Sequence, residues 1–104
     1  MSKFYSLIIN KINQLTNDAV EINFDISNTD SFSFISGQYI TVKHQINNED
    51  VRRAYSICSS PAEGLSIGVK LVEGGKMSSF LIKEVKEGDV LEVMPPSGNF
   101  VIND

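Results

Sequence analysis

The sequence predicts an all-β domain, a six-stranded antiparallel Greek-key barrel with one short helix between the fifth and sixth strands. Three observations support this fold class. Apolar and polar residues alternate in short segments, as they do in half-buried strands. Residues that favour turns separate these segments, and helical spacing of apolar residues occurs in only one of them. Short strands without long helices between them are typical of antiparallel barrels and sandwiches.

The first three strands are predicted over residues 5–15, 20–24 and 39–44. The first segment is rich in side chains that favour strands, namely Leu7, Ile8, Ile9 and Ile12. In the second segment every other residue is apolar, which predicts a strand with one face against a core. The third segment follows the turn residues Ser36-Gly37, and together with residues 90–94 it completes the set of apolar segments.

The remaining elements are strands over residues 52–59, 65–71 and 90–94 and a helix over residues 78–85. The strand at 65–71 alternates in the same way as the strand at 20–24. The helix is predicted because Phe80, Leu81 and Val85 recur at helical spacing. Ser78 or Ser79 is expected to cap its N-terminus.

The composition indicates one acidic domain and limits the classes of partner. A chain of 104 residues fits a single domain, and its net charge of −4 argues against a nucleic-acid surface or an anionic membrane surface. The single cysteine, Cys58, excludes an intramolecular disulfide and cannot alone form a zinc or iron–sulfur site, so no metal site is expected. No signal region is recognisable, and no apolar run approaches the ~20 residues of a membrane span. A reducing cytoplasm is the expected compartment.

The segment Arg53-Ala54-Tyr55-Ser56 is the first candidate binding site. In a strand, Arg53 and Tyr55 share a face and lie about 6–7 Å apart. A guanidinium beside a planar ring suits a ligand with a phosphate at one end and a flat heteroaromatic ring at the other. Ser56 adds a hydroxyl that can hydrogen-bond at the edge of such a ring. The alternative is an ordinary surface arginine next to a tyrosine at the rim of the core.

A second candidate site precedes the predicted helix. Gly74 and Gly75 allow a close approach of the backbone to a ligand, and the amides of a helix N-terminus carry partial positive charge. Lys76 adds a charge and Ser78 a hydroxyl, so the segment suits an anion. Taken alone, this pattern is more typical of a plain turn and helix cap. Arg53 favours the anion interpretation, because the chain then contains two independent elements suited to phosphate.

Together these segments resemble the FAD-binding domain of the ferredoxin reductase family. Arg53-x-Tyr55-Ser56 is similar to the first flavin signature of the family, and Gly75-x-x-Ser78-x-x-Leu81 is similar to the second. The surrounding sequence looks most like the reductase components of phenylacetyl-CoA oxygenases. Residues 37–42 and 88–100 resemble further family segments, so the resemblance extends over nearly the whole chain.

The resemblance implies an FAD cofactor, with FMN as the less favoured alternative. It implies that Tyr55 lies along the flavin ring and that Ser56 hydrogen-bonds near the N5 atom, so these two residues are nearest to the chemistry. The residues expected to bind the cofactor are Arg53, Ala54, Tyr55, Ser56, Val69, Lys70, Leu71, Gly75, Lys76, Met77 and Ser78.

The resemblance further implies that residues 1–104 are the flavin-binding module of an NAD(P)H-dependent oxidoreductase. Electrons would pass from nicotinamide through FAD to an iron–sulfur centre and then to an oxygenase, as in phenylacetate degradation. The nicotinamide-binding domain is expected outside this chain, because no strand–Gly-rich loop–helix unit for a dinucleotide remains in the sequence. The ferredoxin-type domain with a two-iron two-sulfur cluster is also expected outside it, because one cysteine cannot ligate such a cluster. The chain alone is therefore not expected to oxidise NAD(P)H.

Two alternatives remain open from the sequence. A cofactor-free barrel of the oligonucleotide-binding type also pairs basic and aromatic residues on strands, although the acidic balance disfavours it. A barrel that mediates interactions without a ligand is the other alternative. Cys58 is expected to be buried rather than catalytic, and His44 is expected to be exposed and outside any catalytic triad.

Overall fold

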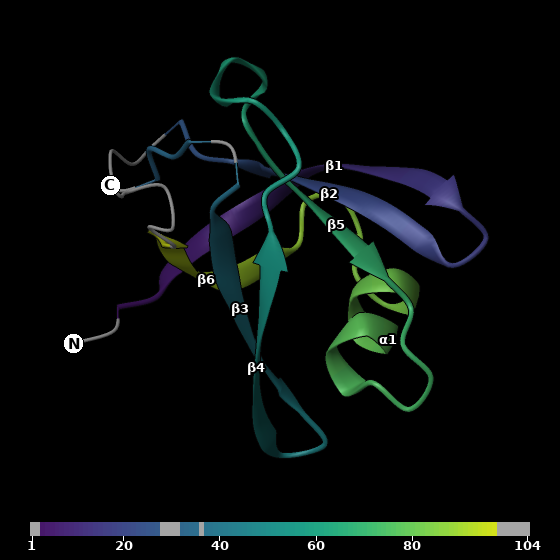
Figure 1. Ribbon diagram of the computed structural model, residues 1–104. Coiled ribbons are helices and arrows are strands. Elements are labelled where there is room, and N and C mark those ends of the chain that lie inside the picture. The colour runs from purple at the N-terminus through teal and green to yellow at the C-terminus, as the bar shows by residue number, and fades with distance from the viewer. Residues whose placement is uncertain (1–2, 28–31, 36, 98–104) are drawn as a thin grey trace.

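A computed structural model describes residues 3–27, 32–35 and 37–97, which form one curved sheet with a helix packed beside it (Figure 1). Every neighbouring strand pair is antiparallel, and the strand order is β4-β3-β6-β1-β2-β5. The elements are β1 (Tyr5–Thr16), β2 (Ala19–Asp25), β3 (Tyr39–Ile46), β4 (Glu49–Ser56), a 3-10 helix (Pro61–Glu63), β5 (Leu65–Lys70), α1 (Lys76–Lys83) and β6 (Val90–Ser97). The last part of the family-like segment 88–100 lies outside the described residues.

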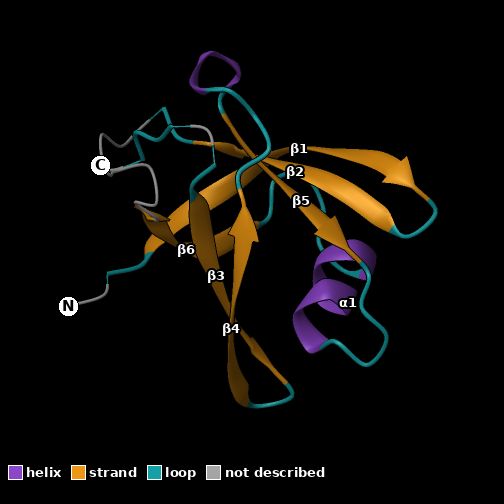
Figure 2. Cartoon of the chain, in the orientation of Figure 1, coloured by secondary structure: helices purple, strands orange, loops and turns teal. Residues whose placement is uncertain are grey.

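Strand β6 joins the two halves of the sheet. The hairpin β1–β2 pairs with β5 on one side, and the hairpin β3–β4 forms the other side. Because β6 pairs with both β1 and β3, the last strand lies between the first hairpin and the second. This arrangement, with one α-helix between β5 and β6, confirms the predicted antiparallel Greek-key fold class (Figure 2).

The sheet curls toward a barrel but does not close. Its end strands, β4 and β5, are joined near one end by a bridge between Ile57 and Ile67. The backbone N–H of Cys58 donates to the carbonyl oxygen of Ser66 across this bridge at 2.9 Å. Helix α1 packs against β3, β4 and β5. We call the margins of β4 and β5 that pair with no other strand in the described ranges, together with the N-terminus of α1, the open edge.

The inside of the curl is a core of alternating apolar side chains from the strands. Met77 and Leu81 are each 1 % exposed and attach α1 to this core. Burying one such side chain contributes about 1.5–3 kcal/mol, so these two contacts hold the buried face of the helix against the sheet. The largest fully buried side chains of the strands are Ile9, Ile22, Phe24, Ile40, Val42, Leu65, Ile67, Val69 and Leu91.

Strand β4 begins earlier and ends earlier than the sequence predicts. Asn47 and Asn48 both have positive φ, 54° and 65°, and form a two-residue hairpin turn that pairs Ile46 directly with Glu49. Strand β4 therefore includes Glu49 and Asp50, charged residues that do not themselves favour strands. It ends at Ser56 rather than at residue 59, because the following residues cross to β5.

Helix α1 begins at Lys76, two residues before the predicted start, and its N-cap is Gly75. The prediction that Ser78 or Ser79 caps the helix is wrong. Ser78 is buried in the first turn, where its hydroxyl oxygen accepts the backbone N–H of Val72 at 3.0 Å. The side chain thus secures the segment before the helix instead of the helix end itself.

Candidate functional site

Arg53 and Tyr55 lie on one face of β4 at the open edge. They pair across the ladder with Val42 and Ile40, which are fully buried, so both side chains start from the core-facing side of the strand. Because β4 is the end strand, Arg53 remains exposed and Tyr55 is only half-buried. A cation and a ring are therefore placed side by side at the margin of the core.

The positive guanidinium of Arg53 lies beside Tyr55, whose phenol is neutral. Nη1 of Arg53 donates to the carbonyl oxygen of Arg52 at 2.7 Å, which holds the guanidinium close to the strand. Burial raises the pKa of the Tyr55 phenol, and the charge of Arg53 opposes this rise only in part. Tyr55 is therefore a hydrogen-bond donor at neutral pH.

Ala54 and Ser56 occupy the alternate positions of β4, and both are exposed. Strand geometry directs their side chains to the face opposite Arg53 and Tyr55. Ser56 is the last residue of the strand, and the next residue, Ile57, donates its N–H to the carbonyl oxygen of Gln38 at 2.9 Å. The structure thus brings Arg53 and Tyr55 together directly, and it places Ser56 at the point where the chain leaves β4.

The N-terminus of α1 supplies the second part of the open edge. Gly74 has a φ of 78°, and the N–H of Gly75 donates to the carbonyl oxygen of Val72 at 2.8 Å, which makes a tight turn. The first N–H groups of a helix have no acceptor within it. Met77 is buried, so only its backbone N–H is available to a ligand, whereas the Lys76 side chain is about half exposed.

Two side-chain contacts join α1 to the hairpin β3–β4. Nζ of Lys76 forms an ion pair with the Glu49 carboxylate at the start of β4. The pKa of Glu49 is lowered chiefly by the hydrogen bond and charge of Lys76, and to a lesser extent by the charge of Arg53. Glu49 is thus close to both candidate anion-binding elements, which lie more than 20 residues apart in the sequence.

The second contact is a ring stack between His44 of β3 and Phe80 of α1. Their centroids are 4.1 Å apart with an interplanar angle of 14°. His44 is partly buried, so the expectation that it is exposed is wrong: the imidazole is covered by the helix. Neither His44 nor Glu49 was predicted from the sequence as a residue of this region. The only local signal was the Asn47-Asn48 turn, which sets the register between β3, the strand of His44, and β4, the strand of Glu49.

Strand β5 offers one polar side chain to the open edge. Val69 is buried, and Lys70 is exposed at the end of the strand. The N–H of Leu71 donates to the carbonyl oxygen of Asp18 at 2.7 Å, so this amide is not available to a ligand. Of these three predicted residues, only Lys70 therefore offers a polar side chain.

Cys58 lies next to the open edge but differs from its expected environment. The thiol is exposed, so the prediction of a buried cysteine is wrong: residues 57 and 58 have left β4 to bridge to β5. Partial burial, followed by the charge of Glu21, raises the pKa of the thiol. A raised pKa makes the thiol less nucleophilic at neutral pH.

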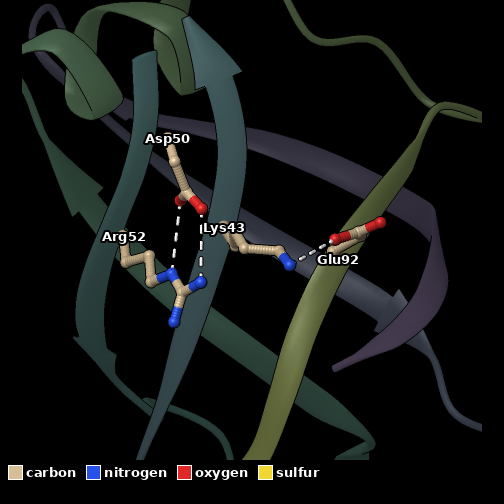
Figure 3. Close-up of polar contacts among 4 residues, drawn as sticks. All are labelled: Lys43, Asp50, Arg52 and Glu92. Carbon is tan, nitrogen blue, oxygen red and sulfur yellow. Dashed lines mark hydrogen bonds and ion pairs between the residues drawn. The ribbon is translucent and has the colours of Figure 1, made fainter. Parts of the chain in front are cut away.

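Two surface grooves include none of the residues predicted to bind a cofactor, although His44 borders one of them. One, of about 430 Å³, includes Lys43, Asp50 and Glu92 on the outer face of the sheet, where Lys43 pairs with Glu92 at 3.1 Å and Asp50 pairs with Arg52 at 3.2 Å (Figure 3). The other lies over β1, β2 and β5 and has a polar lining. Both are shallow and internally charge-paired or hydrogen-bonded, so the chemistry favours the open edge as the candidate site.

Within the described ranges, no helix is long and apolar enough to cross a membrane. Among the same residues, no three His, Cys, Asp or Glu side chains come together as a metal site. The open edge combines cations, backbone amides and an aromatic ring, which is a set suited to an anionic aromatic ligand.

Comparison with known proteins identifies a family with this fold. Residues 6–102 match the family model described as the oxidoreductase FAD-binding domain. The chain is 39 % identical over 103 residues to a subunit of the 1,2-phenylacetyl-CoA epoxidase of Escherichia coli, covering 96 % of this chain and 29 % of the relative. It is 42 % identical over 73 residues to a flavohemoprotein of Pseudomonas aeruginosa, covering 69 % of this chain and 19 % of the relative. The chain thus spans less than a third of the length of these relatives.

Solved structures show the same architecture. Phthalate dioxygenase reductase superposes with a TM-score of 0.77 at 28 % identity, over 96 % of this chain and 32 % of that one. A ferredoxin NADP+ reductase from Neisseria gonorrhoeae with bound FAD and NADP superposes with a TM-score of 0.79 at 23 % identity, over 94 % of this chain and 39 % of that one.

Proposed function

The chain belongs to the oxidoreductase FAD-binding domain family, and from this premise we propose that its open edge holds FAD within an NAD(P)H-dependent oxidoreductase. One observation supports the location best. Arg53 and the N-terminus of α1 both lie near Glu49, which is paired with Lys76 and whose pKa is lowered in part by the charge of Arg53. Lys76 of α1 thus contacts the start of β4, and Arg53 and Tyr55 lie further along the same strand.

The residues at the open edge fit the phosphate groups of FAD. A Cβ at Gly75 would lie 2.8 Å from Oγ of Ser78 and 3.0 Å from the carbonyl oxygen of Val72, so this position leaves room for backbone only. The bare backbone lets an anion approach the N–H groups of the first helical turn. We assign phosphate binding to Arg53, Lys76 and the backbone of Gly75, Met77 and Ser78. Lys70 and the backbone of Val69 and Leu71 would border the polar part of the cofactor.

The other end of the site suits the flavin ring. Tyr55 presents a half-buried ring beside Arg53, and we assign it to contact with the isoalloxazine and ribityl groups. Ser56, at the end of β4, is assigned to a hydrogen bond near N5, and the backbone of Ala54 is assigned to border the cofactor between Arg53 and Tyr55. A serine hydroxyl both donates and accepts, so it can serve a protonated and an unprotonated nitrogen.

When bound, FAD would supply the conversion of one two-electron hydride transfer into two one-electron transfers. In the proposal residues 1–104 form the flavin-binding module, while a nicotinamide-binding domain and a ferredoxin-type domain with a two-iron two-sulfur cluster lie elsewhere in the protein. An oxygenase component would receive the electrons. The name of the epoxidase relative and the description of phthalate dioxygenase reductase, electron transfer from pyridine nucleotides to a 2Fe–2S centre, support this order. A cytoplasmic location belongs to the same proposal.

The test is direct titration of the purified chain with FAD, FMN and riboflavin. Flavin fluorescence and visible absorbance report binding, and circular dichroism reports that the fold is retained. Tighter binding of FAD than of riboflavin is expected, because riboflavin carries no phosphate. A folded chain that binds none of the three flavins would contradict the proposal and leave a cofactor-free barrel, which binding to a single-stranded oligonucleotide would then test.

A further inference from the structure

We infer that His44 is a positioning residue for the phosphate half of the flavin site, acting through its stack on Phe80 of α1. This role rests on the proposed function, because the helix that His44 positions is the one assigned to the FAD phosphates. It extends that proposal to a residue on a different strand from the flavin-binding segment of β4.

Helix α1 cannot set its own position. It has eight residues, and its N-cap, Gly75, makes no side-chain capping hydrogen bond. Isolated helices of this length are not stable in water, so tertiary contacts must hold them. The contacts of α1 therefore determine where its first N–H groups point.

Helix α1 is held on two sides. Met77 and Leu81 lie one turn apart and attach one side to the core. Lys76 and Phe80 are also one turn apart and lie on the adjacent side, which contacts the hairpin β3–β4. The core contacts resist separation of helix and sheet, whereas the hairpin contacts resist rotation and sliding of the helix along its axis.

The ring stack is the stronger of the two hairpin contacts. The Lys76–Glu49 pair is exposed, with side-chain exposures of 48 % and 57 %, and water and salt weaken such pairs. The imidazole of His44 and the ring of Phe80 are both partly buried and nearly parallel at 4.1 Å. Since β3 pairs directly with β4, this stack ties the helix to the strand that carries Arg53.

The test compares how a substitution at His44 changes the Kd for FAD, which carries phosphate, and the Kd for riboflavin, which does not. In His44→Ala, the Kd for FAD is expected to rise about fivefold, a change equivalent to losing one aromatic pair. The Kd for riboflavin should stay within about twofold of wild type, because riboflavin has no phosphate for the helix to bind. His44→Phe, which keeps a stacked ring, should restore FAD binding. Gln45→Ala, an exposed neighbour on β3, serves as the matched control.

A second readout separates positioning from loss of stability. The 31P resonances of bound FAD should shift in His44→Ala and return toward wild type in His44→Phe, with all titrations made well below the unfolding temperature of each variant. If His44→Ala does not fold, His44→Leu keeps the bulk of the side chain without the planar ring and takes its place. Equal weakening of FAD and riboflavin, or no weakening of either, would overturn the inference. Failure of the wild-type chain to bind any flavin would instead contradict the proposed function.

Discussion

Arg52 and Arg53 are neighbours in the sequence, but they lie on opposite faces of β4 and have different partners. Arg52 makes two hydrogen bonds of 3.2 Å to Asp50, and its guanidinium lies 5.2 Å from the ring centroid of Phe4. Arg53 contacts a backbone carbonyl oxygen at the open edge. The two residues therefore form a natural pair of test and control, identical in charge but different in strand face and in partners.

Arg53→Ala should weaken FAD binding about tenfold or more, because a charge-assisted hydrogen bond to phosphate is lost. Riboflavin binding should change little, since that ligand has no phosphate. Arg52→Ala should leave both affinities near wild type. Fluorescence titration of the three proteins with both ligands measures these effects. Equal loss of FAD and riboflavin in Arg53→Ala would refute the phosphate role of Arg53.

Glu49→Gln should strengthen FAD binding about two- to threefold, because it removes a negative charge near Lys76 and Arg53. The gain should disappear at high salt, where such interactions are screened. Thermal unfolding should be unchanged, since the ion pair is exposed. Glu84→Gln at the other end of α1 is the control, and isothermal titration at two salt concentrations is the measurement. Weaker FAD binding in Glu49→Gln would show that the carboxylate holds Lys76 in place for the ligand.

At the scale of elements, the turn before α1 decides how closely a ligand can approach. Gly75→Ala should lower FAD affinity, because the new Cβ would be 2.8 Å from Oγ of Ser78 and would displace the first helical turn. Gly68→Ala is the matched control, since a Cβ there meets no atom within 4 Å. Flavin titration and thermal unfolding of both variants distinguish a local effect from general destabilisation. Unchanged FAD binding in a folded Gly75→Ala protein would place the phosphates elsewhere.

The elements differ in how well they could be predicted from the sequence. Alternation in β2 and β5 identifies both strands, because each buries one face against the core. The start of β4 is missed, since Glu49 and Asp50 do not favour strands and only the pairing from the asparagine turn makes them part of one. The helix start is missed because a serine near a helix end is normally a cap, whereas the Ser78 hydroxyl accepts an N–H from Val72.

The residues of the candidate site also differ in how well they could be predicted from the sequence. Arg53, Tyr55 and the glycines before α1 stand out as local patterns, and the family match covers all of them. The Glu49–Lys76 and His44–Phe80 contacts join distant segments. They depend on the register of the β3–β4 hairpin, for which the Asn47-Asn48 turn is a local signal, and on the position of α1 against the sheet, for which no local pattern is evident.

At the scale of the whole molecule, the described strands pair only in antiparallel fashion. Nucleotide-binding βαβ units require parallel strands, so our proposal places nicotinamide binding in another domain. With FAD added, the chain should therefore oxidise NADH no faster than free FAD does. Loss of NADH absorbance under anaerobic conditions with ferricyanide as acceptor measures this rate. A clearly faster rate would mean that this chain itself binds the nicotinamide.

The unclosed sheet also affects how the ligand-free chain behaves at high concentration. Strand margins without partners expose rows of N–H and C=O groups that can recruit strands from other molecules and start aggregation. On β4 these rows are flanked by the charges of Glu49, Asp50, Arg52 and Arg53. Such charges discourage stacking of one chain on another. Arg53, which is proposed to bind the cofactor, thus also helps to prevent aggregation, and neutralising it to weaken flavin binding would make the protein harder to keep in solution.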